Sequence, residues 1–207
     1  MKMKALKNIG LATFAAFAMT ACVSEDDVDM PHFSPMIFSE DFETNAVDNV
    51  VLAIDGWENI AEQGSMKWKF QYHSSNNYAE FSSYNTNELV NVGWLISPAI
   101  NMDATENERL VFQVAQSYVT NPANKLEVLV STDYQPGMNV ADATWTALEA
   151  SIPGTSATYF AFQPSGVIDL SAYEGNLHLA FKVTGSGTNT ALDGSYQIDN
   201  LRIYSAN

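Results

Sequence analysis

The chain has 207 residues, 46% of them hydrophobic and only 16% charged, and its formal net charge at pH 7 is −15. This composition is too rich in apolar and aromatic residues for a disordered chain, and it is not that of a collagen or a coiled coil. The length favours one domain with an appended segment. Because a strongly acidic surface repels phosphate, we expect no nucleic-acid partner.

Residues 1–21 are predicted to be a signal peptide. Lys2, Lys4 and Lys7 precede an apolar run at residues 9–19. That run has the length of a signal peptide's apolar region, whereas a helix that crosses a bilayer needs about 20 apolar residues. Once these lysines are removed, 6 basic residues remain against 24 acidic ones, and the net charge becomes −18.

Cys22 is the only cysteine of the chain, so it has no disulfide partner within it. The residues before it, Met19-Thr20-Ala21, resemble a bacterial lipobox. The resemblance implies cleavage before Cys22 and acylation of its thiol and its new amino group, with palmitate as a typical acyl chain. Several acyl chains make a stable anchor in membrane lipid, since each buried methylene contributes about 0.8 kcal/mol. The alternative is an ordinary secretory signal followed by an incidental cysteine.

Residues 22–36 are predicted to be the acylated cysteine and an acidic tether. The segment is polar and lacks apolar periodicity, as flexible linkers do. Val23, in place of an aspartate, favours sorting to the outer membrane. The run Glu25-Asp26-Asp27 resembles the surface-export signal of Bacteroidota lipoproteins, which implies a lipid-anchored protein facing the cell exterior. The alternative is a solvated linker with no sorting role.

Residues 37–207 are predicted to form one all-β domain. Apolar side chains alternate along residues 110–115, 126–131 and 177–184, a period typical of strands buried on one face. Turn residues such as Asn76-Asn77 separate these from shorter candidate strands at residues 37–43, 67–72, 78–83, 94–100, 144–149, 159–162 and 197–204. The series predicts a two-sheet jelly-roll β-sandwich of about ten antiparallel strands.

A family resemblance rests on four segments: residues 38–43 with Gly56-Trp57, residues 68–79, residues 93–100 with 110–112, and residues 196–203. Together they resemble the choice-of-anchor J / DUF5017 type of jelly-roll domain of Bacteroidota surface lipoproteins. The layout is also similar to cleaved-adhesin and MAM domains. The resemblance implies a β-sandwich used for adhesion, glycan binding or display, with no shared catalytic activity.

No residue pattern indicates catalysis, and we predict no catalytic residues. The chain has no G-x-S-x-G elbow and no metalloprotease, P-loop or EF-hand spacing. Of its three histidines, His32 lies in the tether and His178 occupies an outward position of a strand, which leaves His73 as a candidate base. A glycosidase would need two carboxylates about 5–9 Å apart in a cleft, and a sequence cannot establish that distance.

A calcium site is implied by the resemblance. The apolar residues of the last strand lie at even positions up to Ile198 and at odd positions from Leu201 onward. A regular strand cannot do this, so the change predicts a β-bulge, which can re-aim the side chain of Asp199. In related jelly rolls a calcium ion is often held by the Glu of a Phe-Glu pair and by an Asp near the C-terminus. Carried over, these are Glu43 and Asp199, with Asp41 as a third ligand, and oxygen ligands suit calcium. The alternative is that these acids are solvated or pair with Arg202.

Four residues in aromatic and amide-rich loops are predicted to contact a ligand: Tyr72, His73, Tyr84 and Tyr118. Loops carry binding residues disproportionately often, although tyrosine is also an ordinary loop residue. Trp57, Trp94 and Trp145 lie in apolar contexts and are expected in the core.

The sequence thus predicts a surface-exposed outer-membrane lipoprotein that recognises an extracellular ligand without catalysis, with a glycan as the leading ligand class. A module for adhesion to, or assembly with, another surface protein is the first alternative. A hydrolase is the second.

Overall fold

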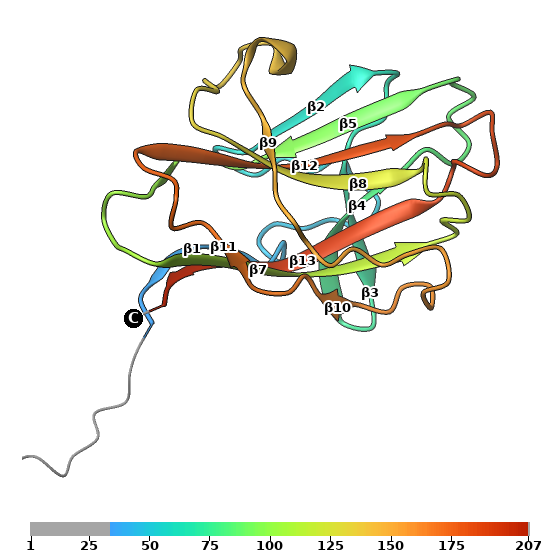
Figure 1. Cartoon of the computed structure of the whole chain (residues 1–207). Coiled ribbons are helices and arrows are strands. Elements are labelled where there is room, and N and C mark those ends of the chain that lie inside the picture. Colours follow the sequence, from blue (N-terminus) through green and yellow to red (C-terminus); the bar gives the residue numbers. More distant parts are fainter. Residues whose placement is uncertain (1–33, 207) are drawn as a thin grey trace, which may run out of the picture. The chain divides into compact units, whose positions relative to one another are not determined.

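Residues 34–206 are described by a computed structural model and form a sandwich of two antiparallel sheets, one above the other in Figure 1. The seven strands of the first sheet are β1 (Met36–Glu40), β3 (Lys69–His73), β4 (Asn76–Ser82), β7 (Glu108–Ser117), β10 (Gln163–Pro164), β11 (Ile168–Asp169) and β13 (Ser195–Ser205). Their order is β10-β7-β13-β4-β3, with β1 paired to β13 and β11 paired to β7.

The second sheet has six strands: β2 (Glu58–Gln63), β5 (Asn91–Ile96), β6 (Ile100–Asn101), β8 (Lys125–Ser131), β9 (Thr146–Ala147) and β12 (Asn176–Gly185). Their order is β2-β5-β12-β8-β9, and β6 pairs with the start of β12. The predicted all-β jelly-roll sandwich is therefore confirmed. It has more strands than expected because several pairings are only two residues long.

Alternate residues of the two sheets fill the space between them. Phe112 of β7 and Phe181 of β12 meet edge to face with their ring centroids 5.2 Å apart. Trp68 is fully buried between Phe81 and Phe181. Since side chains on a strand alternate between faces, every second residue of β7, β12 and β13 reaches this core. The period of two in the sequence thus marked the core correctly.

A second apolar cluster covers the outer face of the second sheet. Trp94 of β5 packs against Trp145 with a centroid distance of 5.0 Å, and Tyr134 also packs against Trp145, at 5.3 Å. The segment between β8 and β9, with its short 3₁₀ turn at Val140–Asp142, supplies Tyr134 and lies over the sheet. His178 is on this outer face, as its parity predicted. It is nevertheless 3% exposed, because Tyr134 lies against its ring.

The tryptophans expected in the core are distributed over both clusters. Trp94 is buried, while Trp57 and Trp145 are partly buried against the first and the second cluster. Trp57 lies near Phe38 and Phe42 at the start of the domain, with ring centroids about 6 Å apart.

Several strand boundaries differ from the sequence prediction. β1 ends at Glu40, because Phe42 has a left-handed backbone (φ 55°) and its N–H donates to the Glu40 carboxylate. No strand forms at residues 159–162, where Phe160 also has a positive φ of 59°. β2 was not predicted, because its sequence is polar and lacks a clear apolar alternation.

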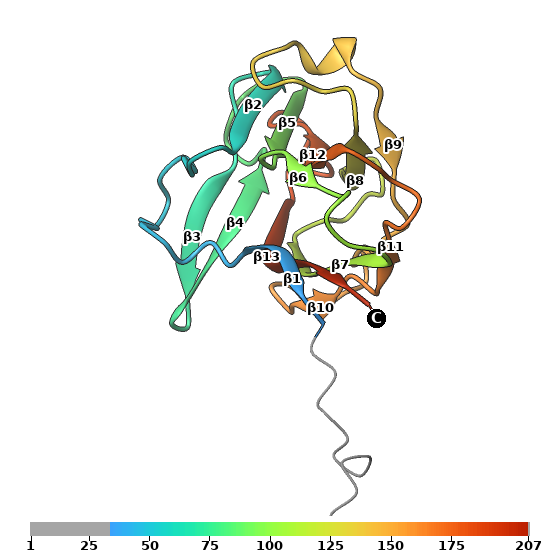
Figure 2. The same ribbon diagram turned by 90° about the vertical axis from the view of Figure 1, so that its left-hand side faces the viewer.

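The hairpin between β3 and β4 turns at Ser74-Ser75, both with positive φ, and not at Asn76-Asn77 as predicted. Asn76 already pairs with His73 as the first residue of β4. The hairpin projects at the edge of the first sheet (Figure 2). The predicted bulge in β13 is confirmed, since the register with β7 shifts between Asp199 and Arg202, and Asn200 has a φ of 50°.

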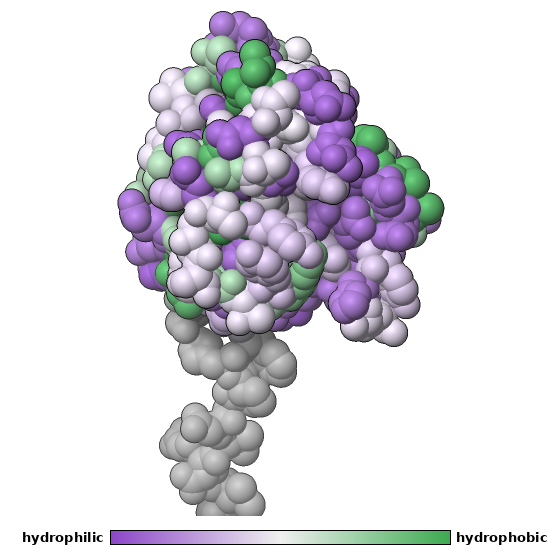
Figure 3. Space-filling model, turned by 90° about the vertical axis from the view of Figure 1, so that its right-hand side faces the viewer, coloured by the Kyte–Doolittle hydropathy of each residue, from purple (hydrophilic) through white to green (hydrophobic). Residues whose placement is uncertain are grey.

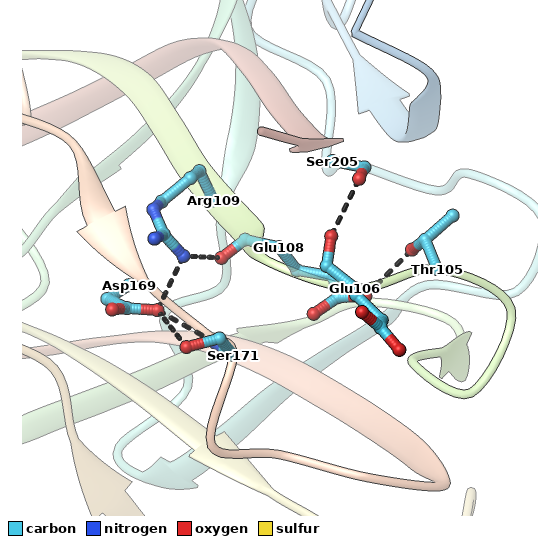
Figure 4. A network of polar contacts seen from close by, with 7 residues as sticks. All are labelled: Thr105, Glu106, Glu108, Arg109, Asp169, Ser171 and Ser205. Atoms are coloured by element: carbon cyan, nitrogen blue, oxygen red, sulfur yellow. Dashed lines mark hydrogen bonds and ion pairs between the residues drawn. The ribbon is translucent and has the colours of Figure 1, made fainter. Parts of the chain in front are cut away.

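A polar network fastens the other end of the first sheet (Figure 4). Arg109 of β7 forms an ion pair with Asp169 of β11 at 2.6 Å and also donates to the Glu108 carbonyl. Hydrogen bonds from Ser171 and the charge of Arg109 lower the pKa of Asp169. Ser205, the last residue of β13, donates to the Glu106 carbonyl at 2.6 Å. The contacts hold β7, β11 and β13 together where the sheet ends.

Among residues 34–206, no helix has the length and apolarity needed to cross a membrane.

Gly93 is predicted to be a position where any side chain destabilises the sandwich. A Cβ at Gly93 of β5 would come within 2.8 Å of three atoms of the Phe81 ring, which reaches across from β4. Overpacking of this kind costs about 1–3 kcal/mol, so Gly93→Ala should lower the melting temperature by roughly 2–10 °C. Gly154→Ala is the control, because nothing lies within 4 Å of its added Cβ. Equal melting temperatures for the two variants would contradict the prediction.

Candidate ligand-binding groove

A groove of about 880 Å³ lies on the outer face of the first sheet, a volume within the range of small-molecule sites. Strands β3, β4 and β13, the last residue of β7 and four loops form it. Its lining consists of Gln71, Tyr72, His73, Tyr78, Glu80, Ser82, Tyr84, Ser117, Tyr118, Thr120, Phe160, Thr190, Asp193 and Ser195.

All four residues predicted to contact a ligand line this one groove. Tyr72 and His73 come from the end of β3, Tyr84 from the loop after β4, and Tyr118 from the residue after β7. Tyr72 is 53% exposed, Tyr84 63% and Tyr118 60%. The fold thus brings together residues that are up to 46 positions apart in sequence. Their role as ligand contacts stays a prediction.

One wall of the groove is a fixed group of aromatic rings. Tyr118 packs against Tyr159 with ring centroids 4.7 Å apart and meets Phe160 edge to face at 6.3 Å. Both Tyr118 and Phe160 have positive φ, at 58° and 59°, which is rare for bulky residues and costs free energy. The Phe160 N–H is tied to the Gln116 carbonyl at 2.9 Å. The surrounding structure therefore holds these rings exposed in a defined position.

Gly194 explains how the loop before β13 can approach Tyr118. A Cβ at Gly194 would lie 2.6–2.7 Å from backbone atoms of Tyr118 and Val119. The loop that carries Asp193 therefore needs a glycine to close this side of the groove.

The floor of the groove is polar and hydrogen-bonded. The Glu80 carboxylate oxygen Oε2 accepts from Gln197 Nε2 at 2.7 Å and from Ser195 Oγ at 3.3 Å. The hydroxyls of Ser117 and Ser195 are 2.6 Å apart, which links β7 to β13 beneath the groove. Desolvation raises the pKa of Glu80, although the hydrogen bonds from Gln197 and Ser195 oppose the shift. The network fixes one carboxylate oxygen of Glu80 at the floor of the groove.

Tyr78 occupies the middle of the groove. It is buried, and its ring meets Phe162 edge to face at 5.4 Å. Desolvation and, secondarily, the charges of Glu80 and Asp48 raise the pKa of Tyr78 to about 12. The phenol is therefore neutral at physiological pH and can both donate and accept a hydrogen bond.

Sequence reasoning missed Glu80, Phe160 and Ser195. Glu80 and Ser195 lie on strands, and their outward parity is visible in the sequence. Parity does not show which outward positions lie under a groove, because that depends on loops from elsewhere in the chain. Phe160 was assigned to a strand and so was not considered as a loop aromatic.

The acids predicted to bind calcium are held by amide groups. Both oxygens of Glu43 accept from Asn77, from its N–H at 2.9 Å and from its side chain at 2.6 Å. Asp199 accepts from the Asn76 side chain at 2.9 Å and from the Asn200 N–H at 2.6 Å. Because Asn76 and Asn77 are successive residues of β4, their side chains point to opposite faces of the strand. Glu43 and Asp199 are thus bound to amides on opposite faces.

Burial raises the pKa of Asp199, and the charges of Glu43 and Asp41 raise it further. The Asp41 carboxylate accepts from the Glu43 N–H at 3.1 Å. In the described part of the chain, no three His, Cys, Asp or Glu side chains are grouped closely enough to hold a metal ion. This arrangement does not itself favour calcium, and the ion stays a prediction.

Comparison with known structures shows that the fold is similar to that of cleaved-adhesin domains. The K3 domain of Lys-gingipain from Porphyromonas gingivalis W83 matches with a TM-score of 0.53 and 20% identity, over 84% of this chain and all of that one. The K1 domain of the same protein matches with a TM-score of 0.51 and 18% identity, over 82% of this chain and 98% of that one. The similarity to cleaved-adhesin domains in layout is therefore confirmed at the level of the fold.

A family 11 carbohydrate-binding module from Clostridium thermocellum, solved with a mixed-linked tetrasaccharide, has a TM-score of 0.48 and 11% identity, over 84% of this chain and 98% of that one. No family model and no curated protein matches this chain.

Chelation tests the calcium prediction. If Glu43 and Asp199 hold calcium, the ion stabilises only the native state, by about 2.7 kcal/mol at a hundredfold excess over Kd. EDTA should then lower the melting temperature by roughly 5–10 °C, and Asp199→Ala should abolish that response. A melting curve that EDTA leaves unchanged would show that these acids serve only as hydrogen-bond acceptors.

Proposed function

We propose that this chain is a surface-exposed outer-membrane lipoprotein that binds an extracellular glycan without catalysis, as a domain of the choice-of-anchor J / DUF5017 type. The observation that carries the binding proposal is the groove, in which exposed aromatic rings stand above a hydrogen-bonded polar floor. A pyranose ring has apolar C–H faces and a rim of hydroxyls, so it needs both kinds of surface.

The charge of the groove selects among glycans. Its lining includes Glu80 and Asp193 and contains no Lys or Arg. Figure 3 shows the side of the molecule that lies at the right of Figure 1, where apolar residues occur in separate patches among hydrophilic ones. Like charges across an interface oppose binding, so a neutral polysaccharide is favoured over sulfated or uronate-rich chains. A protein ligand for adhesion is the alternative, and a broad glycan array without any binding would favour it.

Removal of groove tyrosines should weaken glycan binding. The domain from residue 30 onward should bind at least one neutral polysaccharide, and Tyr118→Ala or Tyr72→Ala should reduce the affinity on the order of tenfold, as truncation of a buried contact does. Tyr204→Ala is a matched control, because this partly buried tyrosine lies at the far end of β13. Affinity gel electrophoresis with the polysaccharide measures the effect.

The outcomes separate the three functions. Equal affinity in Tyr118→Ala and Tyr204→Ala would contradict a glycan site in this groove. Release of reducing sugars from the bound polysaccharide would instead support the hydrolase. Tight binding to heparin would contradict the charge argument.

The proposed lipid anchor depends on Cys22. This residue, the predicted signal peptide and most of the tether lie outside the described residues. Cys22→Ala should move the protein from the outer-membrane pellet to the soluble fraction, because the thiol takes the first acyl chain. Replacement of Glu25, Asp26 and Asp27 by Ala is the companion variant, since it should keep the protein in the membrane and reduce its accessibility to external protease. Equal membrane retention of Cys22→Ala and wild type would contradict the lipoprotein proposal.

A further inference from the structure

A second hollow continues the groove toward the β3–β4 hairpin. It has a volume of about 340 Å³ and shares His73, Tyr78 and Phe160 with the first. Beyond these it is lined by Ser74, Asn76, Gln113, Phe162 and Asp199. The two hollows are therefore adjacent along the outer face of the first sheet. Together, from Tyr84 at one end to Asn76 and Asp199 at the other, they are called the channel.

The channel is long in the direction of the strands. It follows β4 from Asn76 to Ser82, which at about 3.3 Å per residue is roughly 20 Å. That length exceeds a single pyranose ring. Ligands that fill the channel must therefore be elongated.

Each half of the channel is lined by an aromatic ring and by a carboxylate. The first half has exposed Tyr118 and the carboxylate of Glu80. The second has partly buried Phe162 and the carboxylate of buried Asp199, and Phe160 lines both halves. As with Glu80, hydrogen bonds hold Asp199 in place, here from Asn76 and Asn200. Asp199 is the last residue of β13 in regular register with β7 before the bulge, opposite Gln113. A repeated combination of ring face and fixed acceptor suits a ligand made of repeating units.

The strands beneath the channel do not suit an added peptide strand. Peptides that extend a sheet need an unpaired backbone edge. β13 lies between β7 and β4, and β4 lies between β13 and β3. The outer edge of β3, the last strand in the order, is bonded by residues 49 and 50 through Phe70, so backbone partners already pair the floor strands on both sides. The three carboxylates of the channel, Glu80, Asp193 and Asp199, also disfavour an anionic chain.

We infer that the channel binds a neutral oligosaccharide lengthwise, with a second subsite at Gln113, Asn76 and Asp199 that takes further sugar units of the same chain. This inference rests on the proposed glycan-binding function.

Isothermal titration calorimetry with defined oligosaccharides tests the second subsite. The probes are di- to hexasaccharides of β-1,4-mannose, β-1,4-glucose and β-1,3-glucose. For the series that binds, affinity should rise at least about tenfold between the di- and the hexasaccharide. Gln113→Ala should reduce hexasaccharide affinity about three- to tenfold, the worth of one hydrogen bond, and leave disaccharide affinity unchanged.

Gln63→Ala is the matched control, since this exposed glutamine lies on β2 of the other sheet. The titrations are repeated in EDTA, which should not change the length dependence. Affinity independent of chain length, or equal hexasaccharide affinities for Gln113→Ala and Gln63→Ala, would overturn the second subsite while the glycan-binding function stands. No binding of any of these oligosaccharides or of their parent polysaccharides would overturn both.

Discussion

The alternation of side chains along β13 is the constraint on which both the core and the groove depend. Tyr196, Ile198, Leu201 and Ile203 are buried on the side that faces the second sheet. Ser195, Gln197 and Asp199 occupy the other side, beneath or beside the groove. Because one strand serves both faces, a shift of its register by one residue would move the apolar set out of the core and the polar set into it. The fold and the groove are therefore specified together.

The bulge at Asn200 lets β13 change neighbours. Up to Ile198, one edge of β13 pairs with β4, and from Leu201 onward that role passes to β1. The extra residue keeps the apolar side chains of β13 directed toward the core after the change. Its left-handed backbone is a conformation that asparagine tolerates better than most residues. Asp199, directly before the bulge, faces the channel by the same alternation as Ser195 and Gln197. The bulge residue Asn200 shapes the second half of the proposed binding surface through its hydrogen bonds to Asp199.

Most polar groups beneath the groove are hydrogen-bonded to one another, whereas the oxygen Oε1 of Gln197 is buried without a partner. A buried side chain without partners costs about 1–3 kcal/mol, and the contacts among Glu80, Ser117, Ser195 and Gln197 reduce that cost. The same contacts fix the position of the Glu80 carboxylate before any ligand arrives. A preformed site loses less conformational entropy on binding, and the strained Tyr118 and Phe160 contribute to this in the same way.

The sequence by itself determined the fold class, the core strands and the bulge, because these follow from local alternation and from its one break. It also identified Tyr72, His73, Tyr84 and Tyr118 as candidates, since loop aromatics stand out against a regular pattern. Only the tertiary structure decided that these four line one groove, that His178 is covered by Tyr134, and that Glu43 and Asp199 face amides on opposite sides of β4. Those outcomes depend on which distant segments pack together, and alternation along a single strand carries no information about the loop that crosses above it.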